Sequence, residues 1–398
     1  MRPEITLPLK KQAAEKMKKG FPLIEVSALA KKLPPIEEGS IVHLCDEAGT
    51  FIGKGYYGKQ NKGIGWMLTN QKADEINHSF FVNRIKTAFE QRKSLFQDPT
   101  TTAFRLFNGE GDGMGGLTID YYNEFYVFTW YSEGIYEFRT DVYKAFQQVQ
   151  SFKGIYEKKR FASKGEYVED DDFVMGERGE FPLLVKENDI QFAIYLNDGP
   201  MVGVFLDQRE VRKRIKDTYA KGKTVLNTFS YTGAFSVAAA IGGATKTTSV
   251  DLAKRSLPKT IEQFSVNGID YEAQDIVVMD VFNYFKYAKK KELSFDLVIL
   301  DPPSFARSKK HTFSAAKDYT GLLQEAIALT EKNGVIIAST NCSTFNMGKF
   351  HKFIKEAFQK EKLNYEILEQ YTLPRDFKTT KAFSEGDYLK VVFIKVKG

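Results

Sequence analysis

The chain has 398 residues, of which 42 % are hydrophobic and 27 % are charged, and its formal net charge is +6. It contains no run of about 18 apolar residues, which argues against a membrane span, and no basic segment leading into an apolar core of the kind that marks secretion. Its two cysteines cannot build a disulfide framework and no metal-ligand spacing occurs, so we expect a cytoplasmic protein of two or three domains without a metal site.

Residues 1–75 are predicted to form a small β-rich domain. Its expected elements are one short helix and three strands, at Lys11–Lys19, Ser40–Leu44, Phe51–Tyr57 and Gly65–Thr69. Lysines gather within residues 1–32. Such a cluster can neutralise the phosphates of a nucleic acid, but a solvated surface explains it equally well.

Residues 76–200 are predicted to form a central α+β domain. A glycine-rich loop, Asn108–Gly116, joins the first two of its strands. The expected elements are, in chain order, a helix, three strands, a helix and a strand, at 78–96, Thr102–Phe107, Leu117–Asp120, Phe125–Trp130, Gly134–Val149 and Ile190–Leu196.

Residues 201–398 show a different pattern, in which short apolar runs alternate with amphipathic helices. This alternation predicts an α/β domain with a doubly wound, mostly parallel sheet of the Rossmann-like type. The expected strands are Thr224–Leu226, Lys246–Val250, Ile276–Met279, Phe295–Leu300, Gly334–Ala338 and Tyr388–Val396. The expected helices are Gly233–Ile241, Ser256–Asn267, Val281–Lys289, Tyr319–Leu329 and Gly348–Lys360.

A loop after the first of these strands is the candidate ligand site. In doubly wound sheets, ligands bind beyond the carboxyl ends of the strands, and a helix N-terminus there offers free N–H groups to a carboxylate. A glycine at the start of the helix lets the backbone pass close to the ligand. The candidate residues are Asn227, Phe229, Ser230, Tyr231, Thr232 and Gly233.

Two acidic residues at the ends of the next strands complete this site. Asp251 is placed to accept both hydroxyls of a ribose. Asp280 can accept from an adenine amino group, with Val281 or Phe282 packing on the ring. A dinucleotide would need a Gly-x-Gly-x-x-Gly loop for its pyrophosphate, whereas this loop has a single glycine. The pattern therefore favours S-adenosylmethionine, and the run Tyr388–Val396 suits the inserted seventh strand of methyltransferases.

The fourth strand ends in a rigid turn, Asp301-Pro302-Pro303-Ser304-Phe305. Enzymes that methylate amino groups use a similar Asp/Asn-Pro-Pro-aromatic turn to accept from the target amine. Here Ser304 separates the prolines from the aromatic residue, which weakens that match. We count Asp301 and Pro302 among the residues that line the donor site.

Cys342 follows the next strand and is a candidate nucleophile. C5 of a pyrimidine cannot attack a methyl group unaided, but a thiolate that adds to C6 makes C5 enamine-like. Asp301 would hold N3 and the exocyclic amine of the base. The alternative is a buried, inert cysteine, which is common in proteins. The expected position of Cys342 beside the Asp301 turn favours a catalytic role, whereas Cys45 is assigned to packing.

Several motifs together resemble the bacterial large-subunit (23S) ribosomal RNA cytosine-C5 methyltransferases of the three-domain type. The motifs are NGEGDGMGGLTID at Asn108–Asp120, FLDQR at Phe205–Arg209, NTFSYTGAFS at Asn227–Ser236, DPPSF at Asp301–Phe305 and EGDYLK at Glu385–Lys390. The resemblance implies an RNA-binding PUA domain at 1–75, a central domain at 76–200 and a methyltransferase domain at 201–398. It also implies S-adenosylmethionine as methyl donor, ribosomal RNA as partner and a homodimer.

The resemblance also assigns roles by position. Asp251, Asp280 and the Phe229–Gly233 loop match donor-binding motifs, and Asp301 and Cys342 match the acid and the nucleophile. Gln208 and Arg209 match a motif that lies against the donor pocket. Many cytosine-C5 RNA enzymes have a second cysteine in the fourth-strand turn, where this chain has Ser304, so another base or water must assist release of the product.

Two other functions stay open at this point. An enzyme that methylates N2 of guanine, or another amino group of RNA, would need no thiolate and would use the Asp301-Pro302-Pro303 turn. An RNA-binding or assembly protein with a vestigial donor site would bind no S-adenosylmethionine.

Overall fold

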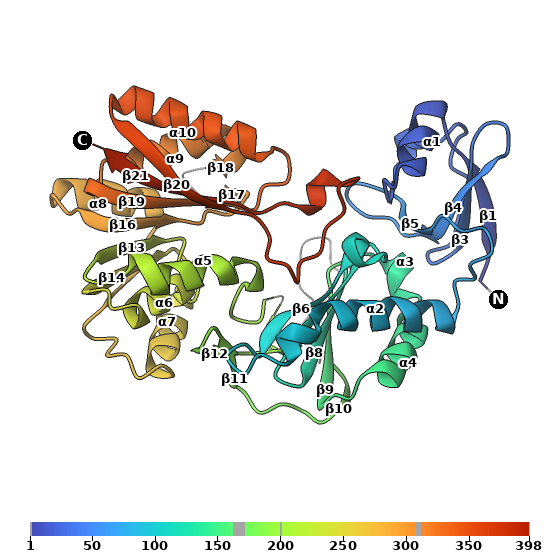
Figure 1. Ribbon diagram of the computed structural model, residues 1–398, viewed down its shortest axis with the longest axis horizontal. Helices are drawn as coiled ribbons and strands as arrows, with labels where there is room; N and C mark the ends of the chain where they lie inside the picture. Colours follow the sequence, from blue (N-terminus) through green and yellow to red (C-terminus); the bar gives the residue numbers. More distant parts are fainter. Residues whose placement is uncertain (1, 162–171, 200, 308–311, 398) are drawn as a thin grey trace. The chain divides into compact units, whose positions relative to one another are not determined.

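The computed structural model describes residues 2–161, 172–199, 201–307 and 312–397. The chain forms two compact units, each assembled from separate stretches of sequence (Figure 1). Unit 1 consists of Met1–Val185, Ile194–Val202 and Arg375–Gly386. Unit 2 consists of Lys186–Ala193, Gly203–Pro374 and Asp387–Gly398. In the described part of the chain, no helix is both long enough and apolar enough to cross a membrane.

The N-terminal part of unit 1 is a five-stranded sheet in the order β1-β3-β4-β5-β2. The strands are β1 (Glu4–Pro8), β2 (Leu23–Ile24), β3 (Ile41–Cys45), β4 (Phe51–Tyr57) and β5 (Gly65–Thr69), accompanied by α1 (Lys11–Lys18) and the turn η1 (Val26–Ala28). A Cβ atom on Gly55 would lie 2.1 Å from the Trp66 carbonyl oxygen, so the close pairing of β4 and β5 requires glycine there. The predicted β-rich region is present, with β1 and β2 as additional strands.

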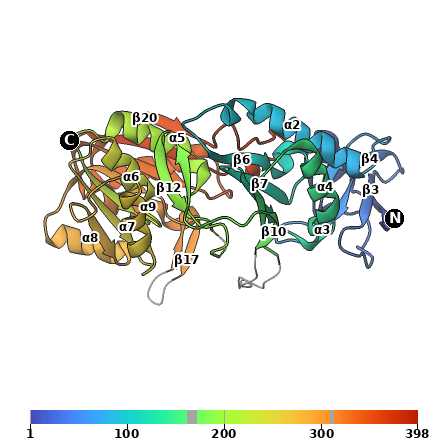
Figure 2. The same ribbon diagram turned by 90° about the horizontal axis from the view of Figure 1, so that it is seen from below.

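A second five-stranded sheet of unit 1 has the order β10-β9-β8-β7-β6. Helices α2 and α4 lie side by side (Figure 2), and both contribute to one continuous core with the first sheet. The predicted single helix Gly134–Val149 is wrong in detail, because two helices occupy this stretch. The elements are α2 (His78–Phe96), β6 (Ala103–Asn108), η2 (Gly109–Asp112), β7 (Leu117–Tyr122), β8 (Phe125–Trp130), α3 (Glu133–Tyr136), α4 (Arg139–Val149), β9 (Gly154–Lys159) and β10 (Phe173–Gly176).

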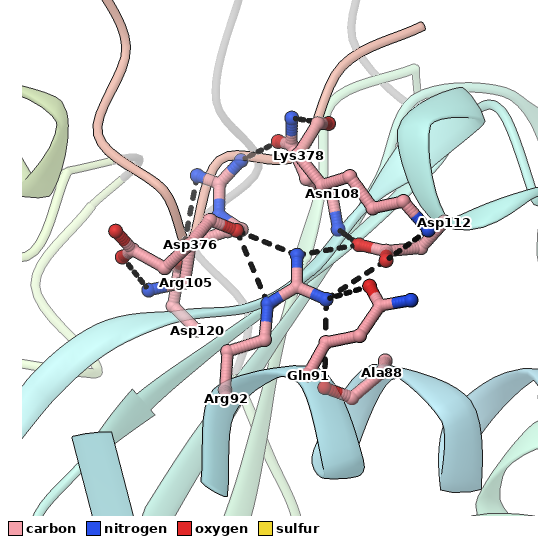
Figure 3. A network of polar contacts seen from close by, with 9 residues as sticks. All are labelled: Ala88, Gln91, Arg92, Arg105, Asn108, Asp112, Asp120, Asp376 and Lys378. Carbon is pink, nitrogen blue, oxygen red and sulfur yellow. Dashed lines mark hydrogen bonds and ion pairs between the residues drawn. The ribbon is translucent and has the colours of Figure 1, made fainter. Parts of the chain in front are cut away.

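The segment Arg375–Gly386, which includes the turn η5 (Ser384–Gly386), packs into unit 1 although it comes from the far end of the sequence. The Arg92 guanidinium pairs with the Asp112 carboxylate at 2.8 and 2.7 Å and also donates to the Asp376 carbonyl at 2.6 Å (Figure 3). A Cβ atom on Gly111 would lie 1.8 Å from the Lys378 carbonyl oxygen. The glycine-rich loop therefore has a packing role, because it admits the backbone of this returning segment.

Unit 2 contains a seven-stranded sheet in the order β15-β14-β13-β16-β19-β21-β20. Strand β21 runs antiparallel to both of its neighbours, and the pairs from β15 to β19 are parallel. The predicted doubly wound sheet with an inserted strand is confirmed, but β20 was not predicted. The strands are β13 (Thr224–Thr228), β14 (Lys246–Asp251), β15 (Asp275–Val278), β16 (Phe295–Leu300), β19 (Thr330–Thr340), β20 (Asn364–Tyr371) and β21 (Lys390–Lys397).

Helices cover both faces of this sheet (Figure 1), because alternate residues of the central strands point to opposite sides. Leu226, Val298 and Leu300 pack with α8, α9 and α10 on one face. Val225, Leu297 and Ile299 pack with α5 and α6 on the other face, and α7 lies beside α6. The helices are η3 (Leu206–Gln208), α5 (Arg209–Arg214), the π-helical turn η4 (Ile215–Tyr219), α6 (Ala234–Ile241), α7 (Ser256–Ser265), α8 (Val281–Lys290), α9 (Ala315–Ile327) and α10 (Met347–Glu361).

Two small sheets complete the described structure. The strands β11 (Leu183–Glu187) and β12 (Ile190–Ile194) pair with each other at the stretch where the chain passes between the units. The strands β17 (Phe305–Arg307) and β18 (Thr312–Ser314) form a hairpin directly after the Asp-Pro-Pro turn.

Candidate active site

The loop after β13 folds back tightly beside the next strand. Phe229, Tyr231 and Gly233 all have positive φ angles, of 55°, 51° and 78°. The backbone N–H of Ser230 donates to the Val250 carbonyl at 3.1 Å, and that of Gly233 donates to the Ser230 carbonyl at 2.7 Å. The loop is therefore tied to β14 and closes in a tight turn at Ser230–Gly233 before α6 begins at Ala234, with Gly233 as its N-cap.

Asn227 and Thr232 are buried within this loop region. The Asn227 amide donates to Ser236 Oγ at 2.9 Å, and Thr232 Oγ1 donates to the Gly203 carbonyl at 2.7 Å. Asn227 Oδ1 is buried and has no hydrogen-bond partner among the described residues. Because buried acceptors are normally paired, this oxygen is suited to accept a bond from a bound ligand.

Asp251 lies at the carboxyl end of β14, where two backbone groups orient its carboxylate. Oδ2 accepts from the Tyr231 N–H at 2.9 Å and Oδ1 accepts from the Ala253 N–H at 2.8 Å. Each carboxylate oxygen has a second lone pair, so the group can still accept two ligand hydroxyls. The structure thus joins Asp251 to the glycine loop, as the adjacent strand ends suggested.

Asp280 is the N-cap of α8 and accepts from the Asn283 N–H at 3.1 Å. The next two residues differ in exposure: Val281 is 3 % exposed and packs in the core, whereas Phe282 is partly exposed and its ring contacts that of Phe229. The Met279 N–H donates to the Asp251 carbonyl at 2.9 Å, which holds the ends of β14 and β15 together.

Asp301 follows β16 and lies in a cluster of polar side chains. Gln208 Nε2 donates to Asp301 Oδ1 at 3.1 Å and to Ser339 Oγ at 2.7 Å. Burial raises the pKa of Asp301 to about 6, and the Asp207 carboxylate adds to the increase. A protonated carboxyl group can donate a hydrogen bond, so at mildly acidic pH Asp301 can act as an acid as well as an acceptor. Pro302, the next residue, is buried.

The Phe205–Arg209 motif forms η3 and the start of α5. Gln208 and Arg209 are 3 % and 4 % exposed, and Arg209 Nε donates to Glu210 Oε1 at 3.3 Å. Asp207 accepts from the Tyr388 hydroxyl at 2.9 Å. This contact joins the motif to the residues just before β21.

Cys342 lies two residues beyond the end of β19 and is 6 % exposed. Its Sγ atom lies 3.1 Å from Thr344 Oγ1, and its backbone N–H donates to Thr340 Oγ1 at 3.2 Å. Since Leu300 pairs with Ala338, the strand that leads to Asp301 adjoins the strand that leads to Cys342. Ser304 Oγ donates to Asn341 Oδ1 at 2.5 Å, so the Asp-Pro-Pro turn contacts the cysteine loop directly.

Several residues that shape this site carry no signal in the sequence. Arg212 makes two hydrogen bonds to the buried Glu187 carboxylate, at 2.7 and 2.6 Å, and one to the Phe205 carbonyl at 2.7 Å. The Tyr319 hydroxyl donates to the Ser339 carbonyl at 2.5 Å. The Arg212–Glu187 and Tyr319–Ser339 partners lie 25 and 20 positions apart in the chain, so no local spacing could have revealed them.

A family model described as S-adenosylmethionine-dependent methyltransferase matches residues 105–387. The chain belongs to this family. A second model, for a PUA-like domain, matches residues 7–70. The expected methyltransferase fold, the PUA-like N-terminal region and S-adenosylmethionine as cofactor are therefore confirmed. The unpaired Asn227 oxygen and the oriented Asp251 carboxylate fit the polar groups of this donor.

Similar proteins match the methyltransferase over nearly its whole length. A putative ribosomal RNA large subunit methyltransferase YwbD of Bacillus subtilis is 61 % identical over 393 residues, which cover 98 % of this chain and 99 % of the relative. The ribosomal RNA large subunit methyltransferase I of Alteromonas mediterranea is 30 % identical over 381 residues, or 96 % of each chain. The crystal structure of SMU.776, a putative methyltransferase complexed with SAH, is 41 % identical with a TM-score of 0.92, and the match covers 98 % of this chain and 100 % of that one.

Proposed function

We propose that this methyltransferase acts on the RNA of the large ribosomal subunit and methylates C5 of a cytosine in 23S ribosomal RNA. The two relatives named as large-subunit ribosomal RNA methyltransferases support the class of substrate. The observation that carries the choice of base is the placement of Cys342 and Asp301 after neighbouring strands, with a raised pKa at Asp301. A nucleophile beside an acid is what carbon methylation of a pyrimidine requires.

The donor is proposed to lie along the carboxyl ends of β13, β14 and β15, where it supplies an electrophilic methyl group. Its amino-acid end is bound by Asn227 and by the backbone of the Phe229–Gly233 loop, which includes Ser230, Tyr231 and Thr232. Asp251 accepts from the ribose hydroxyls. Asp280 accepts from the adenine amino group, and Phe282 is the accessible member of the Val281–Phe282 pair for contact with the ring. The side of the pocket that faces the target base is closed by Gln208, Arg209, Asp301 and Pro302.

The proposed reaction begins when the Cys342 thiolate uses a lone pair to form a bond to C6 of the cytosine. The ring electrons shift toward N3, and protonated Asp301 donates its proton there, which leaves C5 enamine-like. C5 then uses the enamine electron pair to bond the methyl carbon, while the bond from that carbon to the donor sulfur breaks and its electrons stay on the sulfur of the demethylated donor. Loss of the C5 proton to water re-forms the C5–C6 double bond and breaks the S–C6 bond, so the thiolate is regenerated. The N3 proton returns to Asp301.

The test compares Cys342→Ala with Cys45→Ala as a matched control, since the protein has only these two cysteines. Each variant is incubated with large-subunit RNA and the donor, and the RNA is digested for nucleoside analysis. We expect 5-methylcytidine from the wild type and from Cys45→Ala, and a loss of at least about 1000-fold from Cys342→Ala. Undiminished 5-methylcytidine from Cys342→Ala would contradict the covalent route. Methylation at N2 of guanine would instead favour the amino-group enzyme, in which the Asp301-Pro302-Pro303 turn binds the amine.

We further propose the three-part division 1–75, 76–200 and 201–398, in which the first two parts hold structured RNA and the third transfers the methyl group. Pro200, at the second boundary, lies outside the described residues. A cytoplasmic homodimer is part of the same proposal. Light scattering of the purified protein at several concentrations tests the dimer, which a constant monomer mass would contradict.

A further inference from the structure

Lys390 is a buried lysine at the start of β21. It is 4 % exposed, and its ammonium group donates to two main-chain carbonyls, that of Cys342 at 3.0 Å and that of Tyr388 at 2.7 Å. The ammonium nitrogen also lies 5.6 Å from the centre of the Phe345 ring. Within the described residues, no carboxylate oxygen lies within 4.0 Å of the Lys390 ammonium nitrogen.

This arrangement is costly for the fold. Buried charges are normally paired with an opposite charge, because carbonyl dipoles and an aromatic ring replace only part of the lost hydration. Burial accordingly lowers the pKa of Lys390, while the charges of Asp387 and of ionised Cys342 act in the opposite direction. Lys390 is therefore a buried cation without a paired carboxylate, hydrogen-bonded to the main chain of the candidate nucleophile, which makes it a candidate functional group.

We propose that Lys390 is a positioning residue for the nucleophile: its positive charge stabilises the Cys342 thiolate, and its hydrogen bond holds the Cys342 main chain for attack on C6. The proposal rests on the covalent function proposed above. Ionisation releases the thiol proton to solvent, and the negative sulfur then supplies the countercharge that Lys390 lacks. When the S–C6 bond forms, the sulfur lone pair becomes the bonding pair and the negative charge passes to the ring. When that bond breaks, the pair returns to the sulfur as the thiolate.

The experiment measures alkylation of Cys342 by iodoacetamide between pH 6 and 10 by mass spectrometry, with neither RNA nor donor present. The thiolate is the reacting species, so the rate reports the ionised fraction of the sulfur. We expect Lys390→Met to lower the rate at pH 7 about tenfold and to move the pH profile about one unit higher, because a neighbouring charge commonly contributes that much. Lys390→Arg keeps the charge and should restore most of the rate.

Lys395→Met is the matched control, because it makes the same substitution on the same strand at a position that faces the opposite side of the sheet. Its alkylation profile should equal that of the wild type. Lys390→Gln provides a second neutral variant in case Lys390→Met does not fold, and circular dichroism and the affinity for S-adenosylmethionine identify variants that are folded. A folded Lys390→Met or Lys390→Gln protein with the wild-type profile would overturn the proposal, as would failure of Lys390→Arg to restore the rate.

The alkylation result does not depend on which base is methylated. A shifted profile together with nucleoside analysis that finds a product other than 5-methylcytidine would overturn the proposed function and leave the thiolate interaction intact. An unshifted profile together with normal 5-methylcytidine would overturn the role of Lys390 alone.

Discussion

Two sets of charged side chains, the network around Arg92 in unit 1 and the candidate active site in unit 2, differ in how completely their members are paired. In unit 1, Arg92 binds both oxygens of Asp112, and Arg105 binds both oxygens of Asp120 (Figure 3). In unit 2, within the described residues, Asp301 makes no ion pair, and Lys390 makes none either. Paired buried charges hold a fold in one arrangement, whereas buried charges that keep unused capacity can bind a substrate or move a proton.

The largest effect on stability is expected at Arg92. Arg92→Met removes the two-bond partner of the buried Asp112 carboxylate, leaving it only the longer 3.8 Å pair with Lys378, and it removes two bonds to the Asp376 carbonyl. Breaking a buried pair from one side costs about 3–5 kcal/mol. Urea denaturation should show this loss, and the double variant Arg92→Met/Asp112→Leu should recover a large part of it. Equal stability of Arg92→Met and the wild type would remove the contrast between the two sets.

The next effect is expected at Asp301, in catalysis. Asp301→Asn cannot donate a proton to N3 of the base, and proton transfer from a positioned acid contributes about 100- to 10,000-fold to a rate. Single-turnover methylation should fall by at least about 100-fold, while the affinity for S-adenosylmethionine measured by calorimetry should change much less. Asp296→Asn is a control at a carboxylate that binds Thr224 at the opposite end of the same strand.

The pH dependence of stability should sharpen the comparison further. Because the pKa of Asp301 is about 6 in the folded protein and lower in the unfolded chain, the folded state holds this proton more tightly. Asp301 therefore reduces the free energy of unfolding progressively as the pH rises from about 4 to about 6, and the reduction is complete above that. Asp301→Asn should abolish this contribution. A difference between the two proteins that stays constant from pH 4 to pH 8 would contradict the raised pKa.

The smallest effect is expected at an exposed ion pair of unit 1. Lys62 and Glu385 lie 2.5 Å apart, and their side chains are 55 % and 44 % exposed. Surface pairs contribute about 0–1 kcal/mol, because water and salt screen them. Lys62→Ala should change the urea midpoint only slightly, and 0.5 M salt should remove even that difference. A loss comparable to that of Arg92→Met would show that burial is not what separates strong pairs from weak ones here.

Local patterns in the sequence predicted much of the fold. The residues Phe51–Tyr57, Gly65–Thr69, Phe125–Trp130 and Phe295–Leu300 were predicted as strands with the bounds that the structure has. Strand β20 was missed because it is an edge strand that carries Glu366 and Glu369 and has no continuous apolar run. The break between α3 and α4 was missed because the apolar spacing continues across it.

The sequence predicts those residues of the candidate site that lie at the carboxyl ends of strands. Asp251 and Asp301 each directly follow or close an apolar strand, so the sheet order alone brings them to one edge. Lys390 could not be recognised as buried, since lysine is usually exposed and its carbonyl partners are set by tertiary folding. The contact of Arg212 with Glu187 spans 25 positions and two elements, which no spacing rule encodes.

The return of Arg375–Gly386 to unit 1 has a consequence for how the protein is made. Phe383 packs against Phe21 and Trp66, so the core of the N-terminal region includes a ring that is synthesised more than 300 positions later. During translation this core stays incomplete until Phe383 has emerged from the ribosome. Both units therefore reach their final packing nearly together, and a nascent chain released before residue 386 lacks part of each.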